Sequence, residues 1–240
     1  MGQPQPLPSP DVFVFDMDGV LAEVTASYRE TIVSTVRHFT GQTISNEMIQ
    51  AFKNAGGWNN DWELSHRFIK DLGHHVPYQA VVDEFNRIFL GHDSTPGLIG
   101  QESWIPRPGL LEELAETHPL GIFTGRLRYE LEPTIARFVP HLRFHTSITA
   151  DDVARPKPAP DGLHQIQKLF PGKTIWYFGD TVDDARSARD AHVPFFGIAS
   201  PDSLRRDELV SRLHEYGALR VIPDINEVTT LLTETEAPVA

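Results

Sequence analysis

Acidic side chains in this sequence follow directly on short apolar runs. The run "VFVF" leads straight into Asp16, and Asp18 lies two residues further on. The run "IWYFG" ends on Asp180, and Asp184 follows within "GDTVDD". Carboxylates packed together repel one another strongly where the dielectric constant is low. Because a hard dication relieves that repulsion and Mg²⁺ prefers oxygen ligands, the pattern predicts a magnesium site.

A simpler interpretation is that these residues are helix N-caps, a position that Asp and Thr favour. It is sufficient for one aspartate at the end of one strand. It is insufficient for the whole set, because three separate apolar runs deliver these side chains. Ligands of an open α/β sheet bind beyond the carboxyl ends of its strands, so we expect the set to meet at one edge. The set comprises Asp16, Asp18, Thr124 and Asp180.

Positively charged and hydroxyl side chains are expected at the same edge. The run "LGIFT" ends on Thr124, and Gly125 and Arg126 come next. Lys157 lies in "ARPKPAPDG", where the neighbouring prolines restrict the backbone. A lysine that faces a group of acids is suited to clamp a phosphoryl group electrostatically. Arg126 has two interpretations, a contact with a substrate carboxylate or phosphate and a local ion pair.

The elements that would position these residues follow an α/β pattern. Continuous apolar runs rich in β-branched and aromatic residues are typical of strands buried on both faces. Helix-like segments lie between the runs, and this alternation predicts a doubly wound, Rossmann-like parallel sheet. Pro133 is expected to mark the first turn of a helix or a break. The predicted strands are 12–15, 120–124, 175–179 and 194–199, with weaker candidates at 144–148 and 218–222, and the predicted helices are 108–118, 133–138, 161–170 and 183–191.

The interval from about residue 25 to residue 91 has a different pattern. Apolar residues recur there at helical spacing and predict a small helical bundle inserted after the first strand. Ser45 is the expected N-cap of one helix. The exit of the insert is rich in proline and glycine and is expected to be a hinge. We therefore predict a core domain (11–22 and 105–240), a helical cap domain (23–104) and disordered tails (1–10 and 234–240).

The four sequence motifs together resemble those of the haloacid dehalogenase superfamily of phosphohydrolases. The motifs are "DMDGV", "TGR", "RPKP" and "GDTVDD", and they span Asp16 to Asp184 in the order of that family. The helical insert resembles the cap of the superfamily's C1 class. Asp18 favours the phosphatase and phosphomutase branches, because dehalogenating members lack an acid two residues after the nucleophile.

The resemblance implies a mechanism. Asp16 would attack phosphorus and form an aspartyl-phosphate. Asp18 would protonate the leaving oxygen and later take a proton from water. Mg²⁺ would be held by Asp16, by the backbone carbonyl of Asp18 and by Asp180, with Asp184 in support. The phosphoryl oxygens would be held by Thr124, the amide of Gly125 and Lys157.

A loop of the cap is the expected place for substrate selection. Cap loops of C1 relatives reach over the active site, and here Gly56-Gly57 signals a turn before three candidates, Trp58, Asn59 and Asn60. A plain surface turn is the alternative. Several neighbours have structural interpretations. These are Asp61 as a helix N-cap, Tyr28 and Trp62 as cap core, and Asp183 as a solvated neighbour or local cap.

Composition sets the remaining expectations. The 240 residues carry a formal charge of −12 without a basic cluster, so we expect no nucleic-acid partner. There is no cysteine and no long apolar run, which argues against thiolate chemistry and a membrane span. The N-terminal segment does not resemble a signal peptide, so a cytoplasmic location is expected. The cap has no strongly basic stretch, which disfavours a highly anionic substrate.

The predicted function is a Mg²⁺-dependent phosphatase for a small phosphate ester. The alternatives are a phosphomutase and a non-catalytic phospho-ligand binding protein, and the oligomeric state is open.

Overall fold

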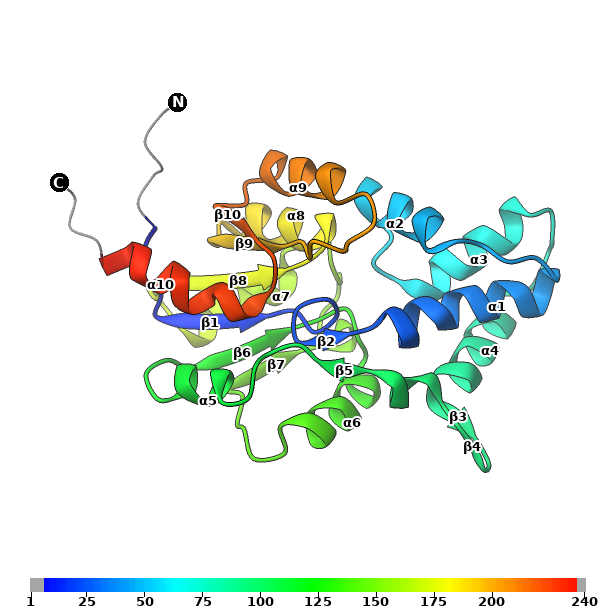
Figure 1. Ribbon diagram of the computed structural model, residues 1–240, viewed down its shortest axis with the longest axis horizontal. Coiled ribbons are helices and arrows are strands. Elements are labelled where there is room, and N and C mark those ends of the chain that lie inside the picture. Colours follow the sequence, from blue (N-terminus) through cyan, green and yellow to red (C-terminus); the bar gives the residue numbers. More distant parts are fainter. Residues whose placement is uncertain (1–6, 237–240) are drawn as a thin grey trace.

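A six-stranded parallel sheet forms the centre of the computed structural model, which describes residues 7–236 (Figure 1). The strand order is β10-β9-β8-β1-β6-β7, so the chain starts in the middle and builds outward first on one side and then on the other. This topology confirms the doubly wound α/β core. The strands are β1 (Val12–Phe15), β6 (Leu120–Phe123), β7 (Thr146–Ile148), β8 (Ile175–Gly179), β9 (Phe195–Ile198) and β10 (Arg220–Ile222).

Helices cover both faces of the sheet. The side chains of β1 alternate, with Phe13 and Phe15 in one apolar cluster and Val12 and Val14 in the other, as the two-residue repeat of a strand requires. The phenylalanine face packs against α5 (Leu110–Ala115), α6 (Arg128–Phe138) and α10 (Val228–Glu236). The valine face packs against α7 (Asp161–Leu169), α8 (Val182–Ala191) and α9 (Arg206–Glu215). Short 3₁₀ turns occur at Ala150–Asp152 and Ile225–Glu227.

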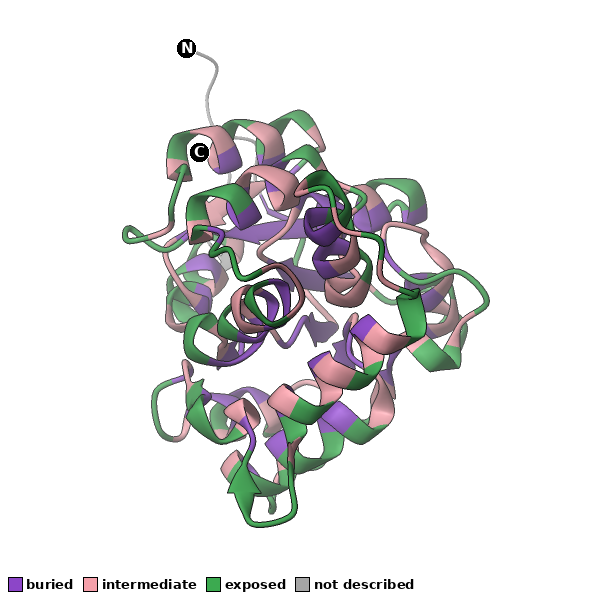
Figure 2. Cartoon of the chain, turned by 90° about the vertical axis from the view of Figure 1, so that its right-hand side faces the viewer, coloured by how far each residue is buried: buried purple, intermediate pink, exposed green. Residues whose placement is uncertain are grey.

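The insert folds as a layer of helices with an apolar core of its own, which we call the cap (Figure 1). Tyr28 belongs to that core, as predicted, and its ring lies 4.1 Å from the ring of Phe89. The buried residues of the cap face inward between the helices, whereas its outer surface is exposed (Figure 2). The cap comprises a π-helical turn (Thr25–Arg29), α1 (Glu30–Thr40), α2 (Asn46–Ala55), α3 (Asp61–Asp71) and α4 (Tyr78–Leu90).

The two connections between cap and core lie side by side. β2 (Ala22–Glu23) pairs antiparallel with β5 (Ser103–Trp104), so the chain enters and leaves the cap through one two-stranded ribbon. The predicted hinge also contains β4 (Thr95–Pro96), which pairs with β3 (Gly91–His92) just before the hinge, and a 3₁₀ turn, Leu98–Gln101. The exact domain boundaries stay a prediction.

Two helix starts differ from expectation. Helix α6 begins at Arg128 and continues through Pro133, so the proline neither starts nor breaks it. Pro133 lies on the exposed side of the helix, while Leu131 and Thr134 are buried and anchor the helix in the core. In α3 the N-cap is Asn60, whose side chain accepts hydrogen bonds from two backbone amides, and not Asp61. Ser45 is the N-cap of α2, as predicted.

The predicted tails are partly ordered. Leu7 is buried against the core, and the carbonyl of Pro8 accepts a hydrogen bond of 2.8 Å from the indole of Trp176. Residues 234–236 continue α10, which corrects the boundary of the second tail. The remaining tail residues, 1–6 and 237–240, lie outside the described part of the chain. No helix within residues 7–236 is long and apolar enough to cross a membrane.

Candidate active site

Two adjacent strands bring the predicted acidic residues together. Asp16 follows β1 and Asp180 follows β8, and the two strands are direct neighbours in the sheet. Gly19 has a φ of +69°, and a side chain there would collide with the carboxyl group of Asp180. Glycine therefore permits the close approach of the loop after β1 to the end of β8. The predicted edge of the sheet exists in the folded protein.

Lys157 is the cation at the centre of this edge. Its ammonium lies 2.9 Å from Asp16 Oδ1 and 2.6 Å from Asp184 Oδ1, and its side chain is fully buried. Burial opposes ionisation of Asp184, but Lys157 and the hydroxyls of Thr181 and Tyr177 hold its pKa below the usual range. Burial raises the pKa of Asp16 to about 7, and Lys157 only partly offsets that effect. One lysine thus serves two carboxylates.

The donor set fits a divalent cation. Oxygen atoms of Asp16, Asp180 and Asp184 lie within 4.8 Å of one another. Asp180 Oδ1 is buried and has no hydrogen-bond partner among the described residues. Burial and the two neighbouring acids raise the pKa of Asp180 well above its usual range. An unpartnered carboxylate oxygen beside two further acids is the environment that a hard cation stabilises.

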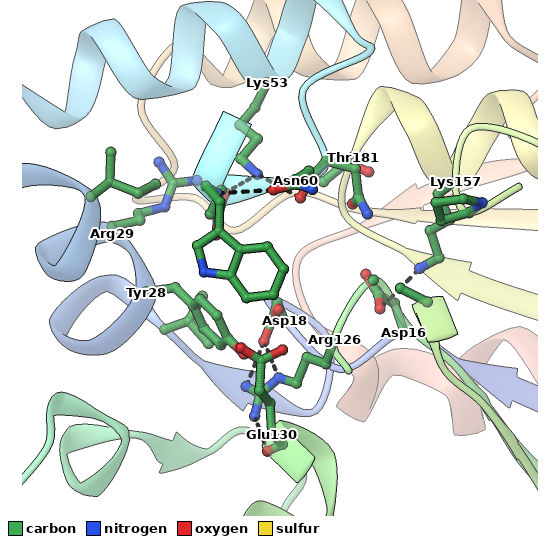
Figure 3. Close-up of a pocket in the computed structure, with 18 of the residues that line it drawn as sticks. Asp16, Asp18, Tyr28, Arg29, Lys53, Asn60, Arg126, Glu130, Lys157 and Thr181 are labelled. Atoms are coloured by element: carbon green, nitrogen blue, oxygen red, sulfur yellow. Dashed lines mark hydrogen bonds and ion pairs between the residues drawn. The ribbon is translucent and has the colours of Figure 1, made fainter. Parts of the chain in front are cut away.

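Arg126 forms a buried ion-pair network. Its Nη2 lies 2.5 Å from Asp18 Oδ1 and 2.7 Å from Glu102 Oε1, and its Nη1 donates to Thr134. The guanidinium also lies 4.9 Å from the ring centre of Tyr28 (Figure 3). Of the two interpretations of Arg126, the structure shows the local ion pair. The arginine fixes the orientation of Asp18, a carboxylate that remains about one-third exposed.

The loop after β6 offers its backbone to the pocket. Thr124 is buried, and its hydroxyl accepts a hydrogen bond from the amide of Arg126. Gly125 and Arg126 line the pocket. A side chain at Gly125 would collide with the carboxamide of Asn59, so the cap loop lies directly over this glycine.

A pocket of about 300 Å³ lies between the sheet edge and the cap (Figure 3). That size suits a small metabolite. Asn59 and Asn60 line it, whereas Trp58 does not. Trp58 instead packs edge-on against Phe52 at 5.0 Å and beneath the guanidinium of Arg67. Trp58 is thus part of the cap packing and is not placed to contact a ligand.

The sequence profile of the haloacid dehalogenase-like hydrolase family matches residues 10–192. This match covers most of the chain and includes every strand-end residue described above. The chain belongs to this hydrolase family. A curated relative from Phytophthora nicotianae, named imidazoleglycerol-phosphate dehydratase, is 32% identical over 245 residues. That alignment covers 94% of this chain but 54% of the relative, so the hydrolase spans about half of the longer protein.

Solved structures share the fold of this hydrolase. A haloacid dehalogenase-like protein from Bacteroides fragilis has a TM-score of 0.70 and 21% identity, with coverage of 92% of this chain and 100% of that chain. A protein from Lactobacillus plantarum, described as a phosphoglycolate phosphatase, has a TM-score of 0.69 and 18% identity, with coverage of 93% of this chain and 100% of that chain. A protein from Thermotoga maritima, described as a β-phosphoglucomutase, has a TM-score of 0.62 and 18% identity, with coverage of 93% of this chain and 99% of that chain.

The hydrolase pocket also contains residues that lie outside the predicted motifs and the predicted cap loop. From the cap come Arg29, whose guanidinium donates to Gln50, and Lys53, which lies 2.6 Å from Asp61. From the core comes Glu130, in the first turn of α6. The cap therefore presents two cations to the pocket although its sequence has no basic stretch. Only the folded packing brings these side chains to one cavity.

Asp183 is neither solvated nor a local cap. It is buried, and its Oδ1 accepts a hydrogen bond of 2.7 Å from the backbone amide of Gly57 in the cap loop. A side chain at Gly56 would touch Val182 and Asp183. Asp183 is therefore a contact between core and cap, and the glycines allow the loop to approach α8.

Proposed function

We propose that the protein is a Mg²⁺-dependent phosphatase that hydrolyses a small phosphate ester through an aspartyl-phosphate on Asp16. The observation that carries the proposal is the setting of Asp16. Its carboxylate lies in a ligand-sized pocket, is paired with Lys157 and is close to Asp180 and Asp184. The hydrolase family and the phosphatases among the fold neighbours support this reading.

Asp16 is the proposed nucleophile. Its Oδ1 lies 2.9 Å from the Lys157 ammonium and accepts a hydrogen bond of 2.7 Å from the Met17 amide. Its Oδ2 has no hydrogen-bond partner among the described residues. In the first step the bond from an Asp16 oxygen to phosphorus forms as the bond to the alcohol oxygen breaks. Water then attacks phosphorus, which frees Asp16 and releases phosphate. Splitting the displacement in this way replaces one difficult step with two easier ones.

Asp18 is the proposed proton carrier. Arg126 holds its Oδ1, and its Oδ2 has no hydrogen-bond partner among the described residues. Asp18 would give a proton to the departing alcohol oxygen and take one from the attacking water. The buried Arg126–Glu102–Thr134 network keeps the carboxylate in one orientation.

The metal is assigned to the sheet edge. Asp16, Asp180 and the backbone carbonyl of Asp18 would hold Mg²⁺. Asp184 would support these ligands indirectly, because both of its carboxylate oxygens are already bonded to Lys157, Tyr177 and Thr181. Bound Mg²⁺ would neutralise charge on the phosphoryl oxygens. Lys157 and the amide of Gly125 would hold the same oxygens, and Thr124 would fix the loop that carries Gly125.

The name of the Phytophthora relative supplies a candidate substrate class. It refers to a phosphate ester of an imidazole-bearing alcohol, and this chain matches about half of that protein. Esters of that chemistry are therefore candidates. The dehydratase activity is not carried over, because the matched region belongs to a hydrolase family.

The test is phosphate release from a panel of small esters, with Mg²⁺ and with a chelator. We expect release that depends on Mg²⁺ and that Asp16→Asn lowers by at least about ten-thousand-fold, because the nucleophile is lost. Asp190→Asn is the matched control, since Asp190 is exposed and pairs only with Arg189. Turnover that persists in Asp16→Asn would overturn the mechanism. Activity that requires a bisphosphate primer would indicate a phosphomutase.

A further inference from the structure

The acids of the pocket differ in whether a cation accompanies them. Asp16 faces Lys157, Asp18 faces Arg126 and Asp61 faces Lys53. Two pocket acids have no ion pair within residues 7–236, namely Asp180 and Glu130. Asp180 lies in the proposed metal site. Glu130 lies on the far side of the pocket from Lys157, beside Tyr28 and Arg126 (Figure 3).

Only one of the two carboxyl oxygens of Glu130 has a hydrogen-bond partner among the described residues. Oε2 accepts a hydrogen bond of 2.8 Å from the amide of Leu127, which caps the start of α6. Oε1 has no hydrogen-bond partner among the described residues, and the residue is only 3% exposed. Burial is the main cause that raises the pKa of Glu130 to about 7. Because Glu130 lines the pocket, this second oxygen is available to accept a hydrogen bond from a ligand.

The surroundings of Glu130 are aromatic. Tyr28, which lies beside Glu130, lines the pocket together with Trp62 and Phe85, and the ring centres of Tyr28 and Trp62 each lie 6.3 Å from that of Phe85. The hydroxyl of Tyr28 is buried without a partner among the described residues. Aromatic faces attract cations, and a nearby carboxyl group attracts them further. This combination recognises a protonated or hydrogen-bond-donating nitrogen better than a neutral polyol or a second anion.

We propose that Glu130 is a specificity residue that binds a basic nitrogen, an ammonium or an imidazole ring, on the alcohol part of the phosphate ester. The inference rests on the proposed phosphatase function and adds the substrate class. With phosphorus at Asp16, the nitrogen reaches the aromatic end of the pocket and donates to Oε1. Arg29 is the charge that argues for an anionic group instead, but its guanidinium already donates to Gln50.

The experiment compares esters that differ only in the nitrogen. Imidazolylethyl phosphate is paired with phenethyl phosphate, and ethanolamine phosphate with ethyl phosphate. We expect kcat/KM to be about tenfold or more higher for each nitrogen-bearing ester, as a hydrogen bond to a charged group predicts. Glu130→Gln should remove most of that preference, chiefly through KM, and leave the nitrogen-free esters within about twofold. Glutamine preserves the cap on Leu127, since Glu and Gln both serve at this position.

Glu132→Gln is the control, because Glu132 lies two residues away on the same helix and is exposed. Equal rates within each ester pair would overturn the inference while the phosphatase function stands. A uniform loss of kcat/KM on all esters in Glu130→Gln would also overturn it, because that result indicates a capping role alone. A preference for glycolate phosphate would overturn it as well, because that result indicates binding by Arg29. Absence of release from every ester, including p-nitrophenyl phosphate, would instead overturn the proposed function.

Discussion

The two walls of the pocket balance charge in different ways. On the sheet side, Lys157 pairs with Asp16 and Asp184, whereas Asp180 has no ion pair among the described residues, and oxygen atoms of the three acids lie within 4.8 Å of one another. On the cap side, Lys53 and Asp61 neutralise each other as a pair. The excess negative charge of the sheet wall favours the binding of a cation. The cap-side arrangement leaves only isolated charges, which can discriminate between ligands.

This contrast separates two tasks that one cavity has to perform. The sheet wall is built from strand ends whose backbones are fixed by neighbours on both sides, so its charges keep their spacing. The cap wall is built from helices joined to the core by a two-stranded ribbon and by loop contacts. In the proposed phosphatase, the reaction steps common to many esters are assigned to the sheet wall, and recognition of a particular ester is assigned to the opposite wall.

Removal of the shared lysine should have the largest effect on stability. Lys157→Met keeps the length of the side chain but leaves Asp16 and Asp184 buried without their cation. We expect the free energy of unfolding to fall by about 3–5 kcal/mol in urea titrations at neutral pH. Lys168→Met, on an exposed position of α7, should change it by less than about 0.5 kcal/mol. Equal stability of the two variants would show that the sheet wall does not depend on this charge.

Glu130, the isolated acid that the core helix α6 contributes to the pocket, should make stability depend on pH. The folded-state pKa of Glu130 is about 7, raised by burial from an ordinary value of 4.5. Its protonated form therefore stabilises the fold fully below about pH 4.5, and this stabilisation is lost as the pH rises through 7. We expect the unfolding free energy of the wild type, relative to Glu130→Gln, to fall by up to about 3 kcal/mol across that range. Parallel pH profiles for the two proteins would contradict this assignment, and Glu132→Gln should follow the wild type.

The contact between the two walls should give the smallest effect. Asp183→Ala removes the acceptor of the Gly57 amide, and we expect that amide to exchange its hydrogen roughly tenfold faster, since the lost bond contributes about 1–2 kcal/mol. Asp183→Asn keeps an oxygen in place and should retain most of the protection. Unchanged exchange in the alanine variant would mean that other contacts hold the cap loop.

The same division explains what the sequence could predict. Asp16, Asp180 and Lys157 could be placed because parallel strands end at a common edge, so the position in the chain determines the position in space. Mg²⁺ as the metal and the roles of these residues stay predictions. The doubly wound sheet could be read from the alternation of apolar runs and helices, and only details such as the passage of α6 through Pro133 differ.

The cap wall could not be predicted in this way. Its contacts depend on which turn of a helix faces which neighbour, and residue spacing does not determine that. Trp58 follows a glycine turn and yet packs on Phe52, while Asn59, its neighbour, covers Gly125. Glu130 has the sequence context of an ordinary helix start. Glu130 belongs to the core helix α6, and its burial arises from tertiary packing that the neighbouring residues in the sequence do not indicate.

The hydrogen bond between Asp183 and Gly57 has a consequence for how this scaffold can be re-engineered. Its donor is a main-chain amide, which every amino acid except proline possesses, although the φ of +80° at Gly57 favours glycine. Asn59 can therefore be exchanged for other residues without removing the bond that docks the loop, whereas Trp58 packs on Phe52 and Asn60 caps α3. A library that varies position 59, with both glycines, Trp58, Asn60 and Asp183 kept constant, would sample new ligand preferences on an intact docking point.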